Sequence, residues 1–226
     1  MARTVGIGIQ DFAKIITEDM FYIDKTHFIK EWWESGDDVT LITRPRRFGK
    51  TLNMEMLECF FSNKYEDRGD LFEGLSIWEE EKYRKLQGTY PVISLSFANA
   101  KGNNFKDVKI IIEQIIKNVY SDFNFLWESE KVSDVEKQFA KKVFGTPEDA
   151  ELSMSLHQLS RALYQYYGKR VIILLDEYDT PMLEAYEKGY WEELVSFTRV
   201  MFNATFKTNS CMFRGIMTGI TRVSKE

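Results

Sequence analysis

Short apolar runs alternate along the chain with segments that carry an amphipathic helical pattern. Four runs predict β-strands, over residues 39–43, 91–97, 171–176 and 211–217. Between consecutive runs, apolar residues recur at helical spacing, so helices are expected to join the strands. This alternation predicts an α/β fold with right-handed crossovers and a mostly parallel, doubly wound sheet.

The helical patterns define several connecting segments. Leu52, Met56, Cys59 and Phe60 follow helical spacing and predict a helix over 52–62 with an apolar stripe in the core. A helix rich in leucine is expected to end near Gly168, because glycine is the usual residue just after a helix. Further helices are expected over residues 26–33, 78–86, 108–119, 133–143 and 190–206, with residues 121–150 forming an insertion or cap.

The first predicted strand leads into a loop that contains the tripeptide Gly49-Lys50-Thr51 and then opens a helix. This strand, loop and helix layout is typical of a phosphate-binding loop. Backbone N–H groups at a helix N-terminus point toward phosphate, and the helix dipole favours negative charge there. The candidate nucleotide-binding residues are Arg46, Arg47, Phe48, Gly49, Lys50, Thr51 and Leu52.

Three of these residues have distinct expected roles. Gly49 permits close approach of the backbone to the phosphates. Lys50 brings a mobile positive charge to the β- and γ-phosphate oxygens, and the Thr51 hydroxyl is suited to ligate Mg²⁺, which prefers oxygen ligands. A Gly-Lys-Thr tripeptide alone is weak evidence, so the prediction depends on a matching acidic strand elsewhere.

That strand is the run 171–175, which delivers Asp176 and Glu177 at its C-terminal end. Asp176 is expected to hold Mg²⁺ directly or through water. Glu177 is expected to polarise the attacking water as a general base, a role that separates a hydrolase from a simple binder. Asp179 is a further candidate ligand for the magnesium ion.

Thr218, at the end of the last predicted strand, is a candidate polar sensor of the γ-phosphate, although a threonine at a strand end is otherwise unremarkable. Lys50, Glu177 and Thr218 are thus the predicted catalytic residues, and Thr51 and Asp176 the metal ligands. Arg222 is expected to be a surface arginine, and the alternatives are a contact with the nucleotide or an arginine finger for a neighbouring subunit.

One position departs from the usual loop pattern Gly-x-x-x-x-Gly-Lys-Ser/Thr, because Arg44 occupies the place of the first glycine. Pro45 further restricts Arg44 to extended geometry, which predicts a stiff loop. The arginines 44, 46 and 47 either contact phosphate or form a solvated basic rim.

The chain resembles the bacterial AAA-ATPase-like proteins in four motifs. These are Arg-Pro-Arg-Arg-Phe-Gly-Lys-Thr at 44–51, Tyr-Ile-Asp-Lys-Thr at 22–26, Leu-Leu-Asp-Glu-Tyr-Asp at 174–179 and Met-Thr-Gly-Ile-Thr-Arg at 217–222. The resemblance covers nearly the whole chain, and the arginine-rich loop is specific to this family. It implies a P-loop NTPase three-layer sandwich that binds ATP and Mg²⁺, with residues 1–226 as one such domain.

In that family the domain is usually followed by a PD-(D/E)XK nuclease-like domain. The sequence ends at Glu226, before the last strand and the helical lid that such ATPases need, so we expect those parts and the nuclease-like domain to be absent. A nucleic acid is therefore expected as a partner only through that absent domain, and a homo-oligomer is a further expectation.

The segment 11–33 commonly lies beside the adenine in this fold, which makes Phe12 and Tyr22 candidate base contacts. Aromatic packing is the alternative for both. For Asp24, Lys25 and Thr26, capping of the following helix is favoured slightly over ligand contact, because Asp and Thr are good N-cap residues.

Composition narrows the class of protein. A chain of 226 residues with 44% hydrophobic residues can bury one substantial core. The net charge of −5 argues against a surface that coats nucleic acid. The two cysteines, Cys59 and Cys211, have no metal or disulfide spacing, and no apolar run is long enough for a membrane span, so we expect a cytoplasmic protein.

The sequence favours an Mg²⁺-dependent ATPase whose nucleotide cycle drives an attached effector domain. A nucleotide-dependent signalling switch with slow or no hydrolysis is the first alternative. A P-loop phosphotransferase is the second, and Glu177 argues against it, because kinases of this fold seldom need a water-polarising glutamate beside the metal-binding aspartate.

Overall fold

The computed structural model describes residues 4–6 and 8–222. They divide into two compact units that are each described separately. Unit 1 comprises the described parts of Met1–Asp38 together with Arg46–Val92. Unit 2 comprises Val39–Pro45 and the described residues from Ile93 onward.

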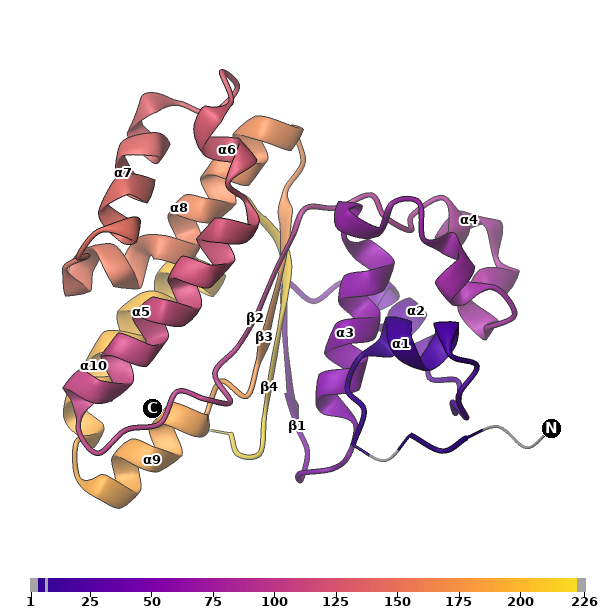
Figure 1. Cartoon of the computed structure of the whole chain (residues 1–226), viewed down its shortest axis with the longest axis horizontal. Helices are drawn as coiled ribbons and strands as arrows, with labels where there is room; N and C mark the ends of the chain where they lie inside the picture. Colours follow the sequence, from indigo (N-terminus) through magenta and orange to yellow (C-terminus); the bar gives the residue numbers. More distant parts are fainter. Residues whose placement is uncertain (1–3, 7, 223–226) are drawn as a thin grey trace. The chain divides into compact units, whose positions relative to one another are not determined.

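Unit 2 contains a four-stranded sheet with the order β1-β4-β3-β2 (Figure 1). The strands are β1 (Val39–Thr43), β2 (Val92–Ser96), β3 (Val171–Asp176) and β4 (Met212–Gly219). β4 pairs in parallel with both β1 and β3. The four strands and the parallel pairing therefore confirm the α/β prediction, whereas the three-layer arrangement stays a prediction.

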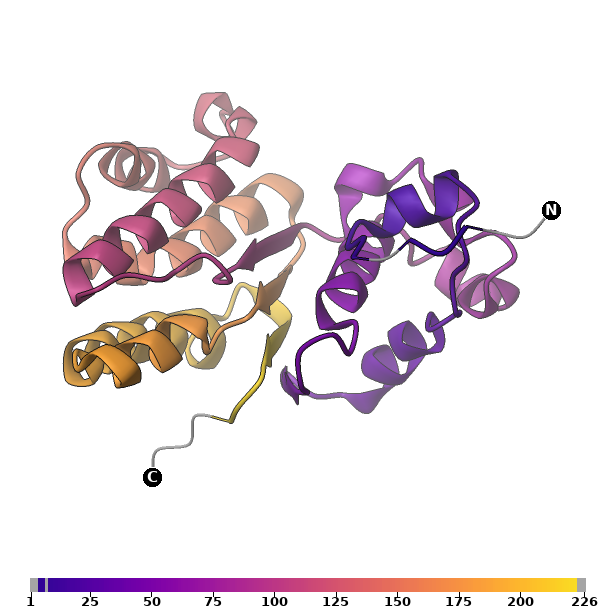
Figure 2. The ribbon, with the colours of Figure 1, turned by 60° about the horizontal axis from the view of Figure 1, so that its bottom comes forward.

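The central strand β3 is buried along its whole length. Helices of unit 2 cover one side of the sheet (Figures 1 and 2). They are α5 (Phe105–Asp122), α8 (Asp149–Tyr167) and α10 (Trp191–Phe202), and α8 contacts both of the others. Burial of each leucine or isoleucine in this core contributes about 1.5–3 kcal/mol relative to an exposed side chain.

Shorter elements complete unit 2. They are α6 (Phe125–Glu128), α7 (Asp134–Phe144), α9 (Thr180–Lys188) and the π-helical turn η4 (Asn203–Lys207). α7 packs on α8, in agreement with the predicted insertion that carries its own helix. Gly168 follows α8 with a φ of 65°, which confirms the predicted helix end.

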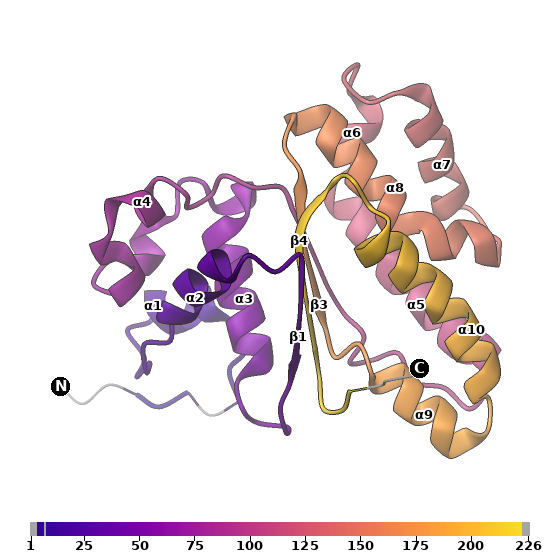
Figure 3. The same cartoon turned by 180° about the vertical axis from the view of Figure 1, so that it is seen from behind.

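Unit 1 consists of helices and turns (Figure 3). Its α-helices are α1 (Phe12–Thr17), α2 (His27–Ser35), α3 (Lys50–Phe61) and α4 (Glu81–Arg84). Its 3₁₀ turns are η1 (Asn63–Tyr65), η2 (Gly69–Phe72) and η3 (Ser76–Glu79). The fully buried Phe12 packs on Tyr22 and Phe72 with ring centroids 5.5 and 5.4 Å away, so Phe12 is a core residue of this unit.

The α-helices that the sequence patterns missed include α1 and α9. α1 is only six residues long, too short for a repeat of apolar positions, and begins where the Asp11 carboxylate accepts a hydrogen bond from Lys14 N–H at 2.8 Å. α9 carries Pro181 in its first turn. The prediction began the helix only near residue 190, although proline is well tolerated at a helix start because that N–H has no intrahelical partner.

No helix in the described part of the chain combines the length and apolar character needed to cross a membrane.

Gly88 of unit 1 makes a close backbone contact that no side chain can enter. Its φ is 68°, and an added Cβ would lie 2.3 Å from Glu66 Cα. Gly74 has a similar φ of 78° but open space around it. We expect Gly74→Ala to lower the free energy of unfolding by about 1–2 kcal/mol through backbone strain alone. Gly88→Ala should cost at least about 1–3 kcal/mol more through steric overlap.

Thermal and urea denaturation of the two variants beside the parent chain measures this difference. Equal losses for the two alanines would show that the Gly88 backbone does not lie against Glu66.

Candidate functional site

The carboxyl ends of three strands lie side by side at one edge of the sheet, the lower edge in Figure 1. Thr43 of β1 is in register with Gly219 of β4, and Leu175 of β3 with Met217 of β4. The Arg44 N–H, directly after β1, donates to the Gly219 carbonyl at 3.1 Å. Residues that follow these strands are therefore brought together within unit 2.

Thr218 connects the two acidic residues that follow the run 171–175. Its hydroxyl donates a hydrogen bond to Asp176 Oδ1, and the Glu177 N–H donates to Thr218 Oγ1 at 3.4 Å. Thr218 and Asp176 are buried, with 1% and 5% exposure. The structure thus brings together Asp176, Glu177 and Thr218, three residues that the sequence analysis singled out separately.

Glu177 differs from Asp176 in burial and in backbone conformation. Its side chain is half-buried, and its Oε2 accepts a hydrogen bond from the Thr180 hydroxyl at 3.0 Å. Its φ is 50°, in the left-handed region that residues with a side chain seldom adopt. Such strain, about 1–3 kcal/mol, often accumulates at functional sites, which makes the Glu177 carboxylate a candidate for chemistry.

Asp179 plays a structural part that the sequence did not reveal. It is 1% exposed, and its Oδ2 accepts hydrogen bonds from Ile220 N–H at 2.8 Å and from Thr221 N–H at 2.7 Å. The Thr221 hydroxyl adds a third hydrogen bond at 2.9 Å. These contacts use one carboxylate oxygen to hold the segment after β4. The exposed Arg222 follows directly.

The predicted phosphate loop belongs to unit 1 and leads into α3, which begins at Lys50 rather than at Leu52. Gly49 is its N-cap residue with a φ of 73°, and Arg47 has a φ of 68°. A left-handed residue followed by a helical one turns successive N–H groups toward the same point, where an anion is favoured. Glycine adopts the φ of position 49 without strain, whereas the close approach of Gly49 to phosphate stays a prediction.

The side chains of this loop divide by exposure. Arg46, Arg47 and Phe48 are exposed, and Phe48 leaves 62% of its surface open, which is unusual for a large apolar side chain. Lys50, Thr51 and Leu52 are half-buried in the first turn of α3. First-turn N–H groups of a helix have no intrahelical acceptor and carry the positive end of the dipole. The loop thus has the backbone geometry of an anion site.

The segment before α2 differs from the predicted cap. Thr26 occupies the N-cap position of α2 but makes no side-chain cap hydrogen bond. Instead, Asp24 Oδ1 accepts from the Thr26 N–H at 2.8 Å and from its hydroxyl at 2.7 Å. The capping interpretation is therefore wrong in detail, because Asp24 organises the turn and Thr26 is the donor.

The oxygen atoms at the strand ends suit a hard cation. Among the described residues, no three His, Cys, Asp or Glu side chains gather closely enough to hold a metal ion by themselves. Mg²⁺ at a nucleotide site takes only one or two protein ligands and completes its shell with phosphate oxygens and water. The buried Asp176 carboxylate fits that limited demand.

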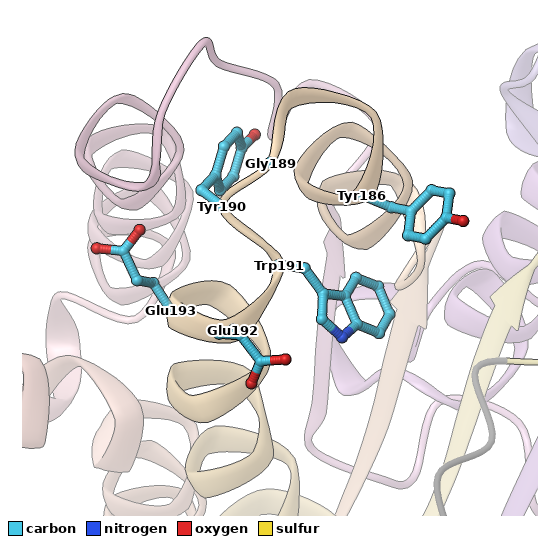
Figure 4. A pocket seen from close by; sticks show the side chains of 6 residues that line it. All are labelled: Tyr186, Gly189, Tyr190, Trp191, Glu192 and Glu193. Atoms are coloured by element: carbon cyan, nitrogen blue, oxygen red, sulfur yellow. The ribbon is translucent and has the colours of Figure 1, made fainter.

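A pocket of about 520 Å³ lies elsewhere in unit 2, at the connection between α9 and α10 (Figure 4). It is lined by Tyr186, Gly189, Tyr190, Trp191, Glu192 and Glu193. No lysine or arginine lines it, and its two carboxylates would repel phosphate groups. This pocket is therefore not a candidate for binding a nucleoside triphosphate.

Comparisons with known proteins agree with the motifs. A family model described as "Predicted AAA-ATPase" matches residues 6–226. A protein of Azotobacter chroococcum mcd 1, described as "Uncharacterized protein in vnfD 5'region", is 27% identical over 99% of this chain and 38% of its own length. The chain thus spans well under half of that relative. No solved structure matches the chain significantly.

The buried Asp179 carboxylate gives a testable consequence. Its Oδ1 has no hydrogen-bond partner among the described residues and would lie 2.7 Å from a Cβ on Gly219. In Asp179→Asn, an amide N–H₂ would replace one carboxylate oxygen at a place without an acceptor for it. We expect the free energy of unfolding to fall by about 1–3 kcal/mol, the cost of a buried unsatisfied polar group.

Chemical denaturation of Asp179→Asn measures this loss. Asp134→Asn, an exposed change in the first turn of α7, is the matched control and should alter stability by less than about 1 kcal/mol. If the two variants are equally stable, the amide N–H₂ finds a hydrogen-bond acceptor and the predicted cost of an unsatisfied group is wrong.

Proposed function

Because the chain belongs to the predicted AAA-ATPase family, we propose that it binds ATP with Mg²⁺ and hydrolyses it on a P-loop NTPase fold. One observation carries the proposal beyond the family assignment. The Thr218 hydroxyl donates a hydrogen bond to the Asp176 carboxylate at the ends of the neighbouring strands β4 and β3. β4 also pairs with β1, the strand that leads into the Gly-Lys-Thr loop. This arrangement supports the proposal because it brings the candidate magnesium ligand beside the candidate γ-phosphate sensor in unit 2.

The loop residues bind the phosphates in this proposal. The N–H groups of Gly49 and of the first turn of α3 donate to phosphate oxygens, and the Lys50 ammonium neutralises charge on the β- and γ-phosphates. Arg46 and Arg47 are exposed cations next to them and add to the positive potential of the loop. Phe48 and Leu52 complete the nucleotide-binding set.

Thr51 and Asp176 would hold the magnesium ion through a hydroxyl and a carboxylate oxygen. When bound, Mg²⁺ neutralises charge that develops on the β- and γ-phosphate oxygens. Both side chains supply oxygen ligands, which this ion prefers. Asp176 is only 5% exposed, so few water molecules compete for its carboxylate.

Glu177 orients and deprotonates the attacking water in this mechanism. Its carboxylate is half-buried, and the Thr180 hydrogen bond to Oε2 restricts its rotamer and leaves Oε1 as the proton acceptor. Thr218 senses the γ-phosphate through its hydroxyl, which donates a hydrogen bond to Asp176. If this hydroxyl changed its hydrogen-bond partner, the contacts of β4 would depend on the bound nucleotide.

The relative of which this chain covers 38% is considerably longer, so we propose that the ATPase acts on a further effector domain. The nuclease-like domain typical of the resembling proteins is the candidate, with nucleic acid as its partner and a homo-oligomer as a candidate assembly. A nucleotide-dependent switch with slow or no hydrolysis is the second candidate function. Glu177 in its strained conformation favours hydrolysis, because a switch needs no water-polarising carboxylate.

Removal of the loop lysine tests nucleotide binding. We expect Lys50→Ala to weaken Mg-ATP binding by about 100-fold or more, because it removes a charge-assisted contact to the phosphates. Calorimetric titration of the purified chain measures the dissociation constant. Lys85→Ala, which removes an exposed lysine from an i,i+4 ion pair with Glu81, should bind as the parent does. Unchanged affinity in Lys50→Ala would remove the loop from the site.

Neutralisation of Glu177 tests hydrolysis. We expect Glu177→Gln to retain Mg-ATP affinity and to lower the turnover rate by about 10²-fold or more, as loss of a general base does. Phosphate release under saturating ATP measures the rate. Glu187→Gln on the exposed face of α9 is the control.

The outcomes separate the two candidate functions. An unchanged rate in Glu177→Gln would remove this residue from the mechanism. A parent chain that binds ATP tightly without phosphate release would favour the nucleotide-dependent switch.

A further inference from the structure

Asp24 anchors the motif Tyr22–Thr26 of unit 1 through hydrogen bonds. Besides its contacts to Thr26, Asp24 accepts a hydrogen bond through Oδ2 from Ser76 N–H at 2.8 Å. Burial opposes ionisation of this carboxyl group, but the hydrogen bonds from Ser76 and Thr26 together outweigh it and lower the pKa of Asp24. The fully buried Thr26 in turn accepts from Ile77 N–H at 3.1 Å. Asp24 thus fastens this motif to the turn η3.

Tyr22 fastens the same motif to α3. Its hydroxyl donates to the Met56 sulfur at 3.4 Å and accepts from the Lys25 N–H at 3.3 Å. Met56 is fully buried in the helix that follows the phosphate loop. The backbone of Lys25 is therefore held between η3 and α3, both in unit 1, so these hydrogen bonds fix its position relative to α3.

The Lys25 side chain leaves this anchored backbone and reaches the loop. Its Nζ lies 3.5 Å from the place that a Cβ on Gly49 would occupy. The side chain is exposed, and among the described residues no carboxylate forms an ion pair with its ammonium group. An ammonium group thus lies beside the backbone of the N-cap residue whose neighbouring N–H groups favour an anion.

We propose that Lys25 is a second phosphate-binding cation of the loop and acts beside Lys50. The inference rests on the proposed ATP binding and assigns a role to a motif that this binding does not otherwise use. Two ammonium groups suit a triphosphate, because ATP carries more negative charge than one lysine neutralises. The anchored motif explains why a flexible side chain can serve here, since fixing its backbone lowers the entropy lost on binding.

The hydrogen bonds of Asp24 also affect the charge that Lys25 presents. Asp24 is the acidic residue next in sequence to Lys25. Because Ser76 and Thr26 occupy both oxygens of Asp24, the two charges are directed to different partners. Lys25 therefore keeps its charge available to a ligand in the loop.

Substitution of Lys25 tests this assignment by calorimetric titration with Mg-ATP, Mg-ADP and magnesium tripolyphosphate, a probe without base or sugar. We expect Lys25→Met to weaken binding of Mg-ATP and of tripolyphosphate by about 10- to 100-fold, the range for loss of a hydrogen bond to a charged group. Lys85→Met removes the same charge from an exposed ion pair of α4 and should bind as the parent does.

A second variant separates charge from structure. Lys25→Arg keeps the positive charge and should retain most of the affinity, and its melting temperature should match that of the parent. If Lys25→Arg binds as weakly as Lys25→Met, the charge is not the determinant and the inference is overturned.

The same titrations distinguish failure of this inference from failure of the proposed function. If Lys25→Met binds like Lys85→Met while Lys50→Ala loses ATP, the ATP site stands and the role of Lys25 is overturned. If the parent chain binds neither ATP nor tripolyphosphate, the proposed function fails and the role of Lys25 fails with it.

Discussion

The arrangement of unit 2 depends on the pairing of β4 with both β1 and β3. This register places Ile42 opposite Thr218 and Leu175 opposite Met217. A shift of one residue would turn every side chain of β4 to the other face and separate the Thr218 hydroxyl from Asp176. Because β4 comes late in the chain, the end of β1 and the acidic end of β3 acquire their neighbour only through contacts between residues far apart in sequence. Such contacts form slowly and cooperatively.

Three acidic residues, Asp176 at the end of β3 and Glu177 and Asp179 just after it, have different hydrogen-bond partners and therefore different roles. Asp179 is committed to the backbone after β4, and Asp176 accepts from the Thr218 hydroxyl. Glu177 is the least buried of the three and makes its side-chain contact to a neighbouring hydroxyl. The sequence alone shows an acidic cluster. The hydrogen-bond partners in the structure distinguish a structural carboxylate from one that can reach a ligand.

The sequence predicted the strands and the end of α8 because those features are local, namely apolar runs and a glycine after a helix. The candidate residues Asp176, Glu177 and Thr218 could be predicted for the same reason, since each lies at or next to a strand end. The role of Asp179 and the position of Lys25 could not be predicted. They depend on pairs such as Asp24 with Ser76, which lie far apart in the chain and leave no periodic pattern.

Backbone strain gives an independent argument about which side chains matter. Arg47 and Glu177 have φ values of 68° and 50°, and each costs about 1–2 kcal/mol relative to a right-handed conformation. Asp19 is similar, but aspartate tolerates this region. Glycine would relieve the strain at both other positions, yet the chain carries an arginine and a glutamate there. Total stability is only about 5–15 kcal/mol, so this cost is significant. The strain at Arg47 and Glu177 is consistent with the roles proposed for their side chains, a phosphate contact and a general base.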